Sequence, residues 1–222
     1  MRRAAAPLGM VLVLAACAGQ GEPRGFKPLA NPSAIVAVEF AFAQDAQDKG
    51  QWTAFRDYAA KDAVMFVPQP VEARDWLKKQ TDPATAVKWE VHSVWMSCDG
   101  SLAVSKGAWQ RTNTFGYFTT VWQRQKRDEY KWTLDQGDGL AEPLAPPDMV
   151  AGSVADCSSR PQPPEIAAAP AGVDQRVGWS DDRTLYWIVR VQPDNARTFG
   201  AFSWTGHGYD EVVNSEVAAG TS

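Results

Sequence analysis

The chain has 222 residues, with 22 basic and 26 acidic side chains and a formal net charge of −4 at pH 7. It contains no basic stripe, which argues against nucleic-acid binding. Hydrophobic residues make up 45% of the chain and ten residues are Trp, so the composition predicts a folded protein and excludes an intrinsically disordered one.

Residues 1–16 have the features of an export signal. Arg2 and Arg3 precede an uncharged apolar run that is too short to span a bilayer as a helix. The run ends in Leu-Ala-Ala-Cys17, which resembles the lipobox of bacterial lipoproteins. Small residues let a peptidase reach the bond before Cys17, and the Cys17 thiol would then carry the lipid. An ordinary secretory signal cleaved nearby is the alternative.

The lipobox resemblance implies where the protein works. A lipidated Cys17 would attach the chain to a membrane of the bacterial cell envelope, because more than one acyl chain gives stable anchoring. Ala18 stands where an inner-membrane retention signal often has Asp. By resemblance to enterobacterial lipoproteins, we expect the outer membrane, with the protein facing the periplasm.

Residues 17–31 are rich in Gly, Pro and polar residues and are expected to form a tether. Apolar residues at helical spacing then predict a helix over 32–47, which begins with an N-capping Asn and a Pro. A second helix is predicted over 51–60, a short strand over 63–67, and a third helix over 71–79.

Period-two patterns begin near residue 87 and predict a half-buried strand over 87–96. In this strand Trp89, Val91 and Trp95 share the more apolar face, and His92 lies on the other face. Further strands are predicted over 102–112, 116–126 and 130–135, and together the four strands form an antiparallel meander.

Residues 141–175 are rich in Pro and Ala and are interpreted as a linker. Beyond it, three strands are predicted over 184–191, 197–205 and 209–213, within a C-terminal β-meander that covers 176–215. We expect residues 216–222 to be a disordered tail. Because three short strands are marginally stable alone, this piece should pack on the main domain or on a partner.

Cys98 and Cys157 remain after signal cleavage, and an exported protein occupies an oxidising compartment. One hypothesis is a disulfide between them, and the other is two separate buried thiols. The two cysteines and two histidines, His92 and His207, have no zinc-site spacing, so no metal and no cofactor are expected.

Element order and one strand pair resemble the nuclear transport factor 2-like superfamily, which includes ketosteroid isomerase and SnoaL-type cyclases. The resemblance covers residues 32–140. The pair comprises 116–125, an aromatic strand containing Trp-x-Arg, and 131–135, a Trp-containing strand. The resemblance implies an α+β fold, with N-terminal helices packed on a curved antiparallel sheet and a pocket at the wide end of the cone.

Relatives use this pocket for isomerisation, dehydration, cyclisation or binding alone, so fold does not give function. A ketosteroid isomerase-like reaction needs a carboxylate base and buried hydrogen-bond donors. Asp57, Asp62, Asp135 and Asp138 are acids near such positions, but no catalytic residue is assigned. His92 should point away from the pocket. The candidate ligand-binding residues are Tyr58, Trp89, Tyr117, Trp132 and Asp135.

Strand 116–126 carries aromatic residues on both faces, with Tyr117 on one and Phe118 and Trp122 on the other. An antiparallel sheet with one wet side rarely does so, and we expect the second face to be covered by the C-terminal strands or by a homodimer. The leading functional hypothesis is a module that binds a small apolar ligand or an envelope partner. The alternatives are an isomerase or dehydratase acting on a carbonyl compound, and a structural envelope protein.

Overall fold

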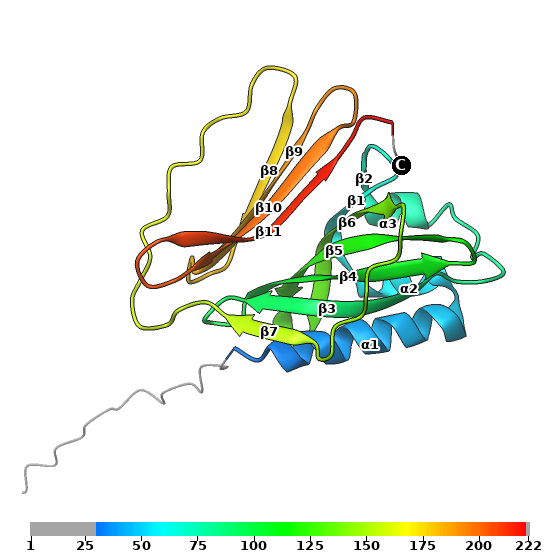
Figure 1. The fold of residues 1–222 in the computed structure, drawn as a ribbon, viewed down its shortest axis with the longest axis horizontal. Helices are drawn as coiled ribbons and strands as arrows, with labels where there is room; N and C mark the ends of the chain where they lie inside the picture. The colour runs from blue at the N-terminus through cyan, green and yellow to red at the C-terminus, as the bar shows by residue number, and fades with distance from the viewer. Residues whose placement is uncertain (1–29, 221–222) are drawn as a thin grey trace, which may run out of the picture.

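The structure is a computed structural model that describes residues 30–220, and it has an α+β fold with two β-sheets (Figure 1). The predicted export signal, Cys17 and almost all of the predicted tether lie outside the described residues. The N-terminal helices are α1 (Pro32–Lys49), α2 (Gln51–Tyr58) and α3 (Ala73–Leu77). A 3-10 turn, η1 (Lys126–Asp128), lies between two strands of the larger sheet.

The larger sheet has seven strands in the order β2-β1-β6-β5-β4-β3-β7. Their bounds are β1 (Ala59–Phe66), β2 (Pro70–Glu72), β3 (Lys88–Met96), β4 (Leu102–Arg111), β5 (Thr114–Arg124), β6 (Tyr130–Leu140) and β7 (Ala151–Val154). Strands β3 to β6 form the predicted antiparallel meander. The sheet as a whole is mixed, because β1 pairs parallel with β6 and β7 pairs parallel with β3.

The second sheet is antiparallel and has four strands, in the order β11-β10-β9-β8. Their bounds are β8 (Asp174–Trp179), β9 (Leu185–Val191), β10 (Arg197–Trp204) and β11 (Tyr209–Val217). The sequence predicted three strands and missed β8, whose pattern is interrupted by Gly178. A side chain at Gly178 would collide with the indole of Trp187 on the neighbouring strand. Strand β11 also runs two residues into the region predicted to be a disordered tail.

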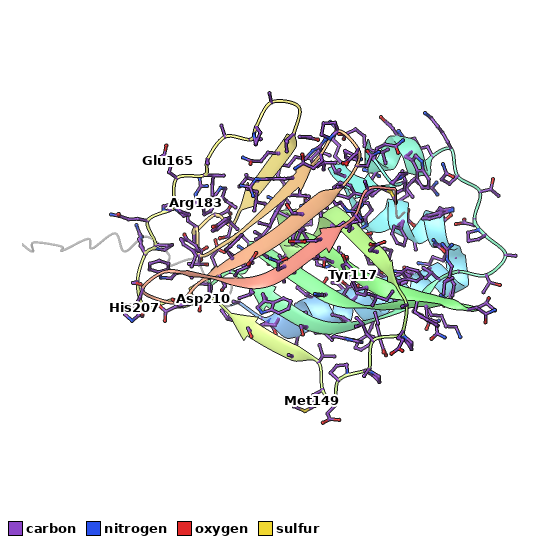
Figure 2. All side chains as sticks on the ribbon, turned by 45° about the horizontal axis from the view of Figure 1, so that its top comes forward. Tyr117, Met149, Glu165, Arg183, His207 and Asp210 are labelled. Carbon is purple, nitrogen blue, oxygen red and sulfur yellow. A yellow bond between two sulfur atoms is a disulfide. The ribbon has the colours of Figure 1, made fainter. Side chains whose placement is uncertain are left out.

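Two apolar cores lie on opposite faces of the larger sheet. The inner core packs the helices on the sheet and includes Ile35, Phe42, Trp122 and Trp132. The outer core lies between the two sheets, and it joins residues of the larger sheet to residues of the smaller one: Leu102, Val104, Val121, Leu134, Leu185, Trp187, Val189, Val191, Phe199, Ala201 and Val213. The C-terminal sheet therefore covers the second face of the meander, as one of the two sequence hypotheses held (Figures 1 and 2).

The predicted alternation along β3 is wrong beyond residue 91. A register shift between Val91 and Ser93 reverses which residues face the helices. As a result Trp89, Val91, Val94 and Met96 all contact the inner core, whereas Trp95 packs against the outer core. The bulge lets one strand supply apolar side chains to both cores.

Several other predicted elements differ in length. Helix α2 stops at Tyr58 because Ala59 is already extended, with φ −70° and ψ 137°, and β1 begins there. The third helix is shorter than predicted, because residues 70–72 form strand β2. Strand β6 continues five residues past the predicted end at Asp135, through Gly137 and Gly139. The region interpreted as a linker also contributes the edge strand β7.

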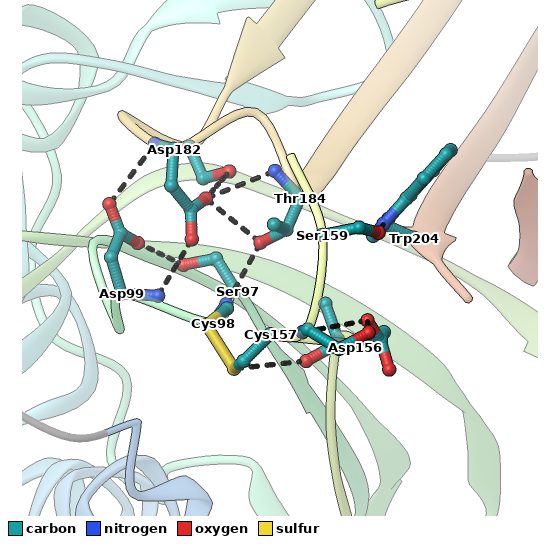
Figure 3. Close-up of a disulfide and its surroundings, with 12 residues drawn as sticks. Ser97, Cys98, Asp99, Asp156, Cys157, Ser159, Asp182, Thr184 and Trp204 are labelled. Carbon is teal, nitrogen blue, oxygen red and sulfur yellow. Dashed lines mark hydrogen bonds between the residues drawn. A yellow bond between two sulfur atoms is a disulfide. The ribbon is translucent and has the colours of Figure 1, made fainter. Parts of the chain in front are cut away.

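Two turns with the same internal hydrogen bonds join the sheets: residues 97–102, between β3 and β4, and residues 180–185, between β8 and β9. In the first, Asp99 Oδ1 accepts hydrogen bonds from the Ser97 and Ser101 hydroxyls. In the second, Asp182 Oδ1 accepts the equivalent bonds from Ser180 and Thr184. We call these two segments the paired turns (Figure 3).

The paired turns also bond to each other reciprocally. The Asp99 amide donates to Asp182 Oδ2 at 2.8 Å, and the Asp182 amide donates to Asp99 Oδ2 at 3.1 Å. Beside them, Cys98 and Cys157 form a disulfide with their Cα atoms 5.4 Å apart (Figure 3). These contacts fix the C-terminal sheet and the preceding segment to one end of the larger sheet.

Candidate functional site

A cavity of about 820 Å³ opens between α1, α2 and the inner face of the larger sheet. Its walls are mainly aromatic and apolar, with a few polar groups. We call it the main pocket, and its lining includes Phe42, Gln51, Trp52, Phe55, Met65, Phe66, Val87, Trp89, Trp109, Arg111, Phe115, Tyr117, Phe118, Thr120, Asp135, Asp138 and Leu140. This size and composition are typical of small-molecule sites. Tryptophan side chains wall the pocket and do not fill it.

Asp135 of β6 is a partly buried carboxyl group in this lining. It is opposite Thr120 in the β5–β6 register, and the Thr120 hydroxyl donates a 2.7 Å hydrogen bond to Asp135 Oδ2. No described residue donates a hydrogen bond to Asp135 Oδ1. One carboxyl oxygen is thus held by the sheet, while the other is left for a ligand or solvent.

The surroundings of Asp135 raise its pKa to about 7. Removal from water is the largest cause, since it disfavours the charged carboxylate. The hydrogen bond from Thr120 and the charge of Arg197 lower the pKa, whereas the nearby Glu39 raises it. Asp135 therefore changes charge near neutral pH, which is unusual for an aspartate.

A second buried carboxyl group, Glu39, lies behind the pocket wall, and the sequence analysis missed it. Its Oε1 accepts hydrogen bonds from the Ser105 hydroxyl at 2.5 Å and from Trp122 Nε1 at 3.0 Å. Its Oε2 accepts one from Trp89 Nε1 at 3.3 Å. Burial nonetheless raises the pKa of Glu39 above its ordinary value.

A signal for Glu39 was present in the sequence. The buried positions of α1 are Ile35, Glu39, Phe42 and Ala46, which follow the three- and four-residue spacing of one helix face. A glutamate on the apolar stripe of a helix needs buried donors. Three donors come from β3, β4 and β5, which lie far along the chain, so only the acid itself was visible in the sequence.

The aromatic walls are packed against one another. The ring centroids of Phe42 and Trp89 are 4.8 Å apart, and those of Phe55 and Trp89 are 5.8 Å apart. Trp52 makes an edge contact with Phe55 at 5.6 Å. Because Trp89 also donates its indole N–H to Glu39, the buried acid fixes the orientation of one pocket wall.

The five candidate ligand-binding residues divide into two groups. Trp89, Tyr117 and Asp135 line the main pocket. Tyr58 does not: its hydroxyl donates to Asp45 Oδ2, and its ring stacks on Phe42 at 4.7 Å. Trp132 is fully buried in the inner core, where its indole N–H donates to the Phe55 carbonyl.

Tyr117 lines the main pocket, but its hydroxyl group does not face the cavity. Its neighbours Phe118 and Thr120 mark the inner face of β5, and the Tyr117 hydroxyl lies on the other side. There burial raises its pKa, and Asp138, Arg197 and Ser215 of β11 are its neighbours. Figure 2 shows Tyr117 near the end of β11.

Of the other acids considered in the sequence, Asp138 lines the main pocket, and Asp57 and Asp62 do not. Arg111 also lines it. Asp57 is exposed on α2, and His92 lies 3.4 Å from Glu90 in the part of β3 where the bulge occurs. Arg124 donates to the Asp99 carbonyl. Within residues 30–220, no three His, Cys, Asp or Glu side chains form a group that would hold a metal ion.

Comparisons with known proteins give a fold-level similarity only. No sequence profile of a known protein family matches the chain, and no curated protein sequence is significantly similar to it. Among solved structures, it is similar to a candidate ketosteroid isomerase from Parabacteroides distasonis. The TM-score is 0.38 and the identity 15%, over 52% of this chain and 97% of the other.

Two further solved structures are similar to about half of the chain. One is a protein of unknown function with a cystatin-like fold from Methylobium petroleophilum, with a TM-score of 0.36 and 11% identity over 53% of this chain and 82% of the other. The other is an NTF-2 like protein of unknown function from Burkholderia xenovorans, with a TM-score of 0.34 and 13% identity over 53% of this chain and 91% of the other.

Proposed function

We propose that the protein is a binding module that takes a small, largely apolar ligand into the main pocket. The observation that carries this proposal is the pairing of aromatic walls with one carboxyl oxygen, Asp135 Oδ1, that accepts no hydrogen bond from the described residues. Apolar walls supply affinity, and a single polar group sets orientation. A purely structural role would leave this open cavity without a purpose.

Native mass spectrometry of the full chain, purified gently from its host, tests the proposal. We expect a small mass that stays bound under native conditions and leaves on denaturation. Leu140→Trp should reduce its occupancy, because the larger indole at the end of β6 would project into the pocket. Leu144→Trp is the matched control, since Leu144 is exposed and absent from the pocket lining. Equal occupancy in both variants would contradict binding in this pocket.

Acid–base catalysis on a carbonyl compound is the second candidate, and the pKa of about 7 for Asp135 favours it. Such a reaction also needs donors aimed at the developing oxyanion. Two indole donors of the lining are already used, Trp89 by Glu39 and Trp109 by the Tyr117 carbonyl. This is why binding ranks first. Deuterium uptake at the α-carbon of a cyclic ketone, lost in Asp135→Asn, would instead support catalysis.

We further propose that the protein is anchored through a lipidated Cys17 to the bacterial outer membrane and faces the periplasm. The support is the sequence pattern of residues 1–17. In the described residues, no helix has the length and apolar character needed to cross a membrane. Cys17→Ala should abolish labelling by a fatty-acid probe. Continued labelling of this variant would contradict lipidation at Cys17.

A further inference from the structure

We propose that the ligand of the main pocket carries a cationic ammonium group, which Asp135 pairs with and the aromatic side chains surround. The inference rests on the proposed function of the same pocket and deepens it by naming the ligand's chemical class. An alkyl- or arylalkyl-ammonium compound combines the apolar body that the walls need with the charge that the acid needs.

The walls of the main pocket are rich in aromatic rings. The rings of Phe42, Trp52, Phe55, Trp89 and Phe118 all line the cavity. Aromatic faces attract cations through the ring quadrupole, and Trp does so most strongly. The attraction grows where water is excluded. A neutral apolar ligand would be served equally well by Leu, Ile and Val, so the walls alone favour a cation without requiring one.

The charged groups around the cavity also favour a cation. The lining contains two carboxyl groups, Asp135 and Asp138, and Glu39 lies behind the wall close enough to raise the pKa of Asp135. Arg111 is the one cationic residue in the lining, and it is exposed at the end of β4. The interior therefore favours positive charge and disfavours an anion.

Arg197 does not reverse this balance. It comes from β10, where its Nε donates to Gln136 Oε1 and its Nη2 to the Gly137 carbonyl. Its guanidinium group also lies 4.8 Å from the centre of the Phe66 ring. Arg197 is thus tied to β6, and its charge lowers the pKa of Asp135 without cancelling the effect of burial.

One oxygen of the Asp135 carboxyl group is free to bind a ligand. Oδ2 is held by Thr120, and no described residue donates to Oδ1. Oδ1 remains accessible from the cavity, so a ligand donor there would replace water. An ammonium group supplies both donors and charge. Binding it would favour the ionised form of Asp135, so affinity should rise with pH.

Three probes that share a phenylalkyl framework and differ in their polar end group test this inference: 4-phenylbutylammonium, 4-phenylbutanol and 4-phenylbutanoate. They are titrated calorimetrically into the full chain in neutral detergent, after subtracting their partitioning into empty micelles. We expect the ammonium compound to bind at least about ten-fold tighter than the alcohol at about pH 8.5. The carboxylate should bind most weakly. An alcohol that binds as tightly as the ammonium compound would overturn the inference.

The pH dependence gives a second readout. The ammonium probe keeps its charge, because amines titrate near a pKa of about 10.4. If only ionised Asp135 binds it, affinity should fall about 30-fold between about pH 8.5 and about pH 5.5. A ligand that accepts a proton from neutral Asp135 would show the opposite trend. Glu39, Asp138, Arg111 and Arg197 are the other charged groups that face Asp135 or the pocket.

Asp135→Asn separates the charge from the shape of the pocket. It should lose the preference for the ammonium probe and its pH dependence, while alcohol binding stays within about three-fold of the wild type. Asp57→Asn makes the same substitution on the exposed side of α2 and should behave like the wild type. Unchanged ammonium binding in Asp135→Asn would refute the pairing. If the wild type binds none of the probes, the proposed function itself fails.

Discussion

The carboxyl group of Asp135 couples the stability of the protein to pH. Its pKa is about 7 in the folded chain against an ordinary value of 3.8, and burial is the main cause. Between these two values the folded state holds a proton that the unfolded state releases. Folding is therefore most favourable at low pH in this window, and stability falls as pH rises from about 4 to about 7.

Asp135→Asn should remove this dependence. The amide oxygen can still accept the hydrogen bond from Thr120, but no charge forms at high pH. Relative to the wild type, the variant should gain up to about 1.4 kcal/mol of unfolding free energy per pH unit between about pH 4 and about pH 7. Urea unfolding at several pH values measures the difference. A difference that does not change with pH would contradict the raised pKa.

At the residue scale, the sequence predicted some residues of the main pocket but could not separate them from residues of the inner core. Trp89 and Asp135 line the pocket because each lies on the inner face of a strand. Asp138 lies beyond the predicted end of its strand, yet β6 continues past it, and Gly137 fits closely against the Tyr117 carbonyl. Trp132 and Tyr58 looked equally suitable, and only three-dimensional packing separates a core ring from a pocket wall.

Among the connecting elements, the disulfide between Cys98 and Cys157 spans 59 residues of chain. Closing a loop of this length stabilises the folded state by about 4 kcal/mol in the chain-entropy description. Cys98→Ser should therefore lower the melting temperature under oxidising conditions, as thermal unfolding would show. With reductant present, wild type and variant should melt together. An equal gap in both conditions would mean that packing of the cysteine, and not the bond, matters.

The paired turns should behave as one energetic unit. Asp99→Ala or Asp182→Ala removes a carboxylate that accepts bonds within its own turn and from the other turn. Each should destabilise the fold by about 2–4 kcal/mol, as loss of charge-assisted hydrogen bonds does. The double variant should lose less than the sum, because both break the same contact. Chemical unfolding of all three measures the coupling.

Asp181→Ala is the matched control for the paired turns. Asp181 is exposed, and in the described residues its carboxylate takes part in no hydrogen bond. Its removal should change the unfolding free energy by less than about 0.5 kcal/mol. Strict additivity of Asp99→Ala and Asp182→Ala would show that the turns act independently.

The elements that the sequence predicted share one property: their patterns are local. Helix α1 and strands β4 and β5 follow regular spacing and were found within three residues of their bounds. Strand β7 was missed because it is exposed along its length and is defined only by pairing with β3. The bulge in β3 was missed because a prediction from strict alternation assumes that the pairing register of the strand does not shift.

At the scale of the whole molecule, the aromatic residues on both faces of β5 predicted that something covers the second face. The outer core shows that the C-terminal sheet does so, because Val104 and Val121 share one apolar cluster with Leu185 and Phe199. The sequence could not choose between this arrangement and a homodimer, because either would bury the same residues. The C-terminal sheet can cover this face only if the segment between β7 and β8 is long enough to place it there.

A chain that ends at residue 173 tests how much the molecule depends on this cover. It lacks β8 to β11 and exposes Leu102, Val104, Val121 and Leu134. We expect it to lose cooperative unfolding, bind a hydrophobic dye and form soluble aggregates, which size-exclusion chromatography would reveal. A chain that ends at residue 218 keeps every strand and should match the wild type. A monomeric shorter chain with unchanged melting would show that the cover is dispensable.

The covered outer face also sets an order of events during synthesis. All strands of the meander have been made by Leu140, but the residues that cover them begin at Leu185 and end at Val213. Until these residues emerge, the outer apolar residues of the meander have no partner from the C-terminal sheet. Strand edges and apolar faces in such intermediates attract other chains. The risk of aggregation is therefore highest after Leu140 has been made and before the covering residues have been made, and a chaperone would be most useful at that stage.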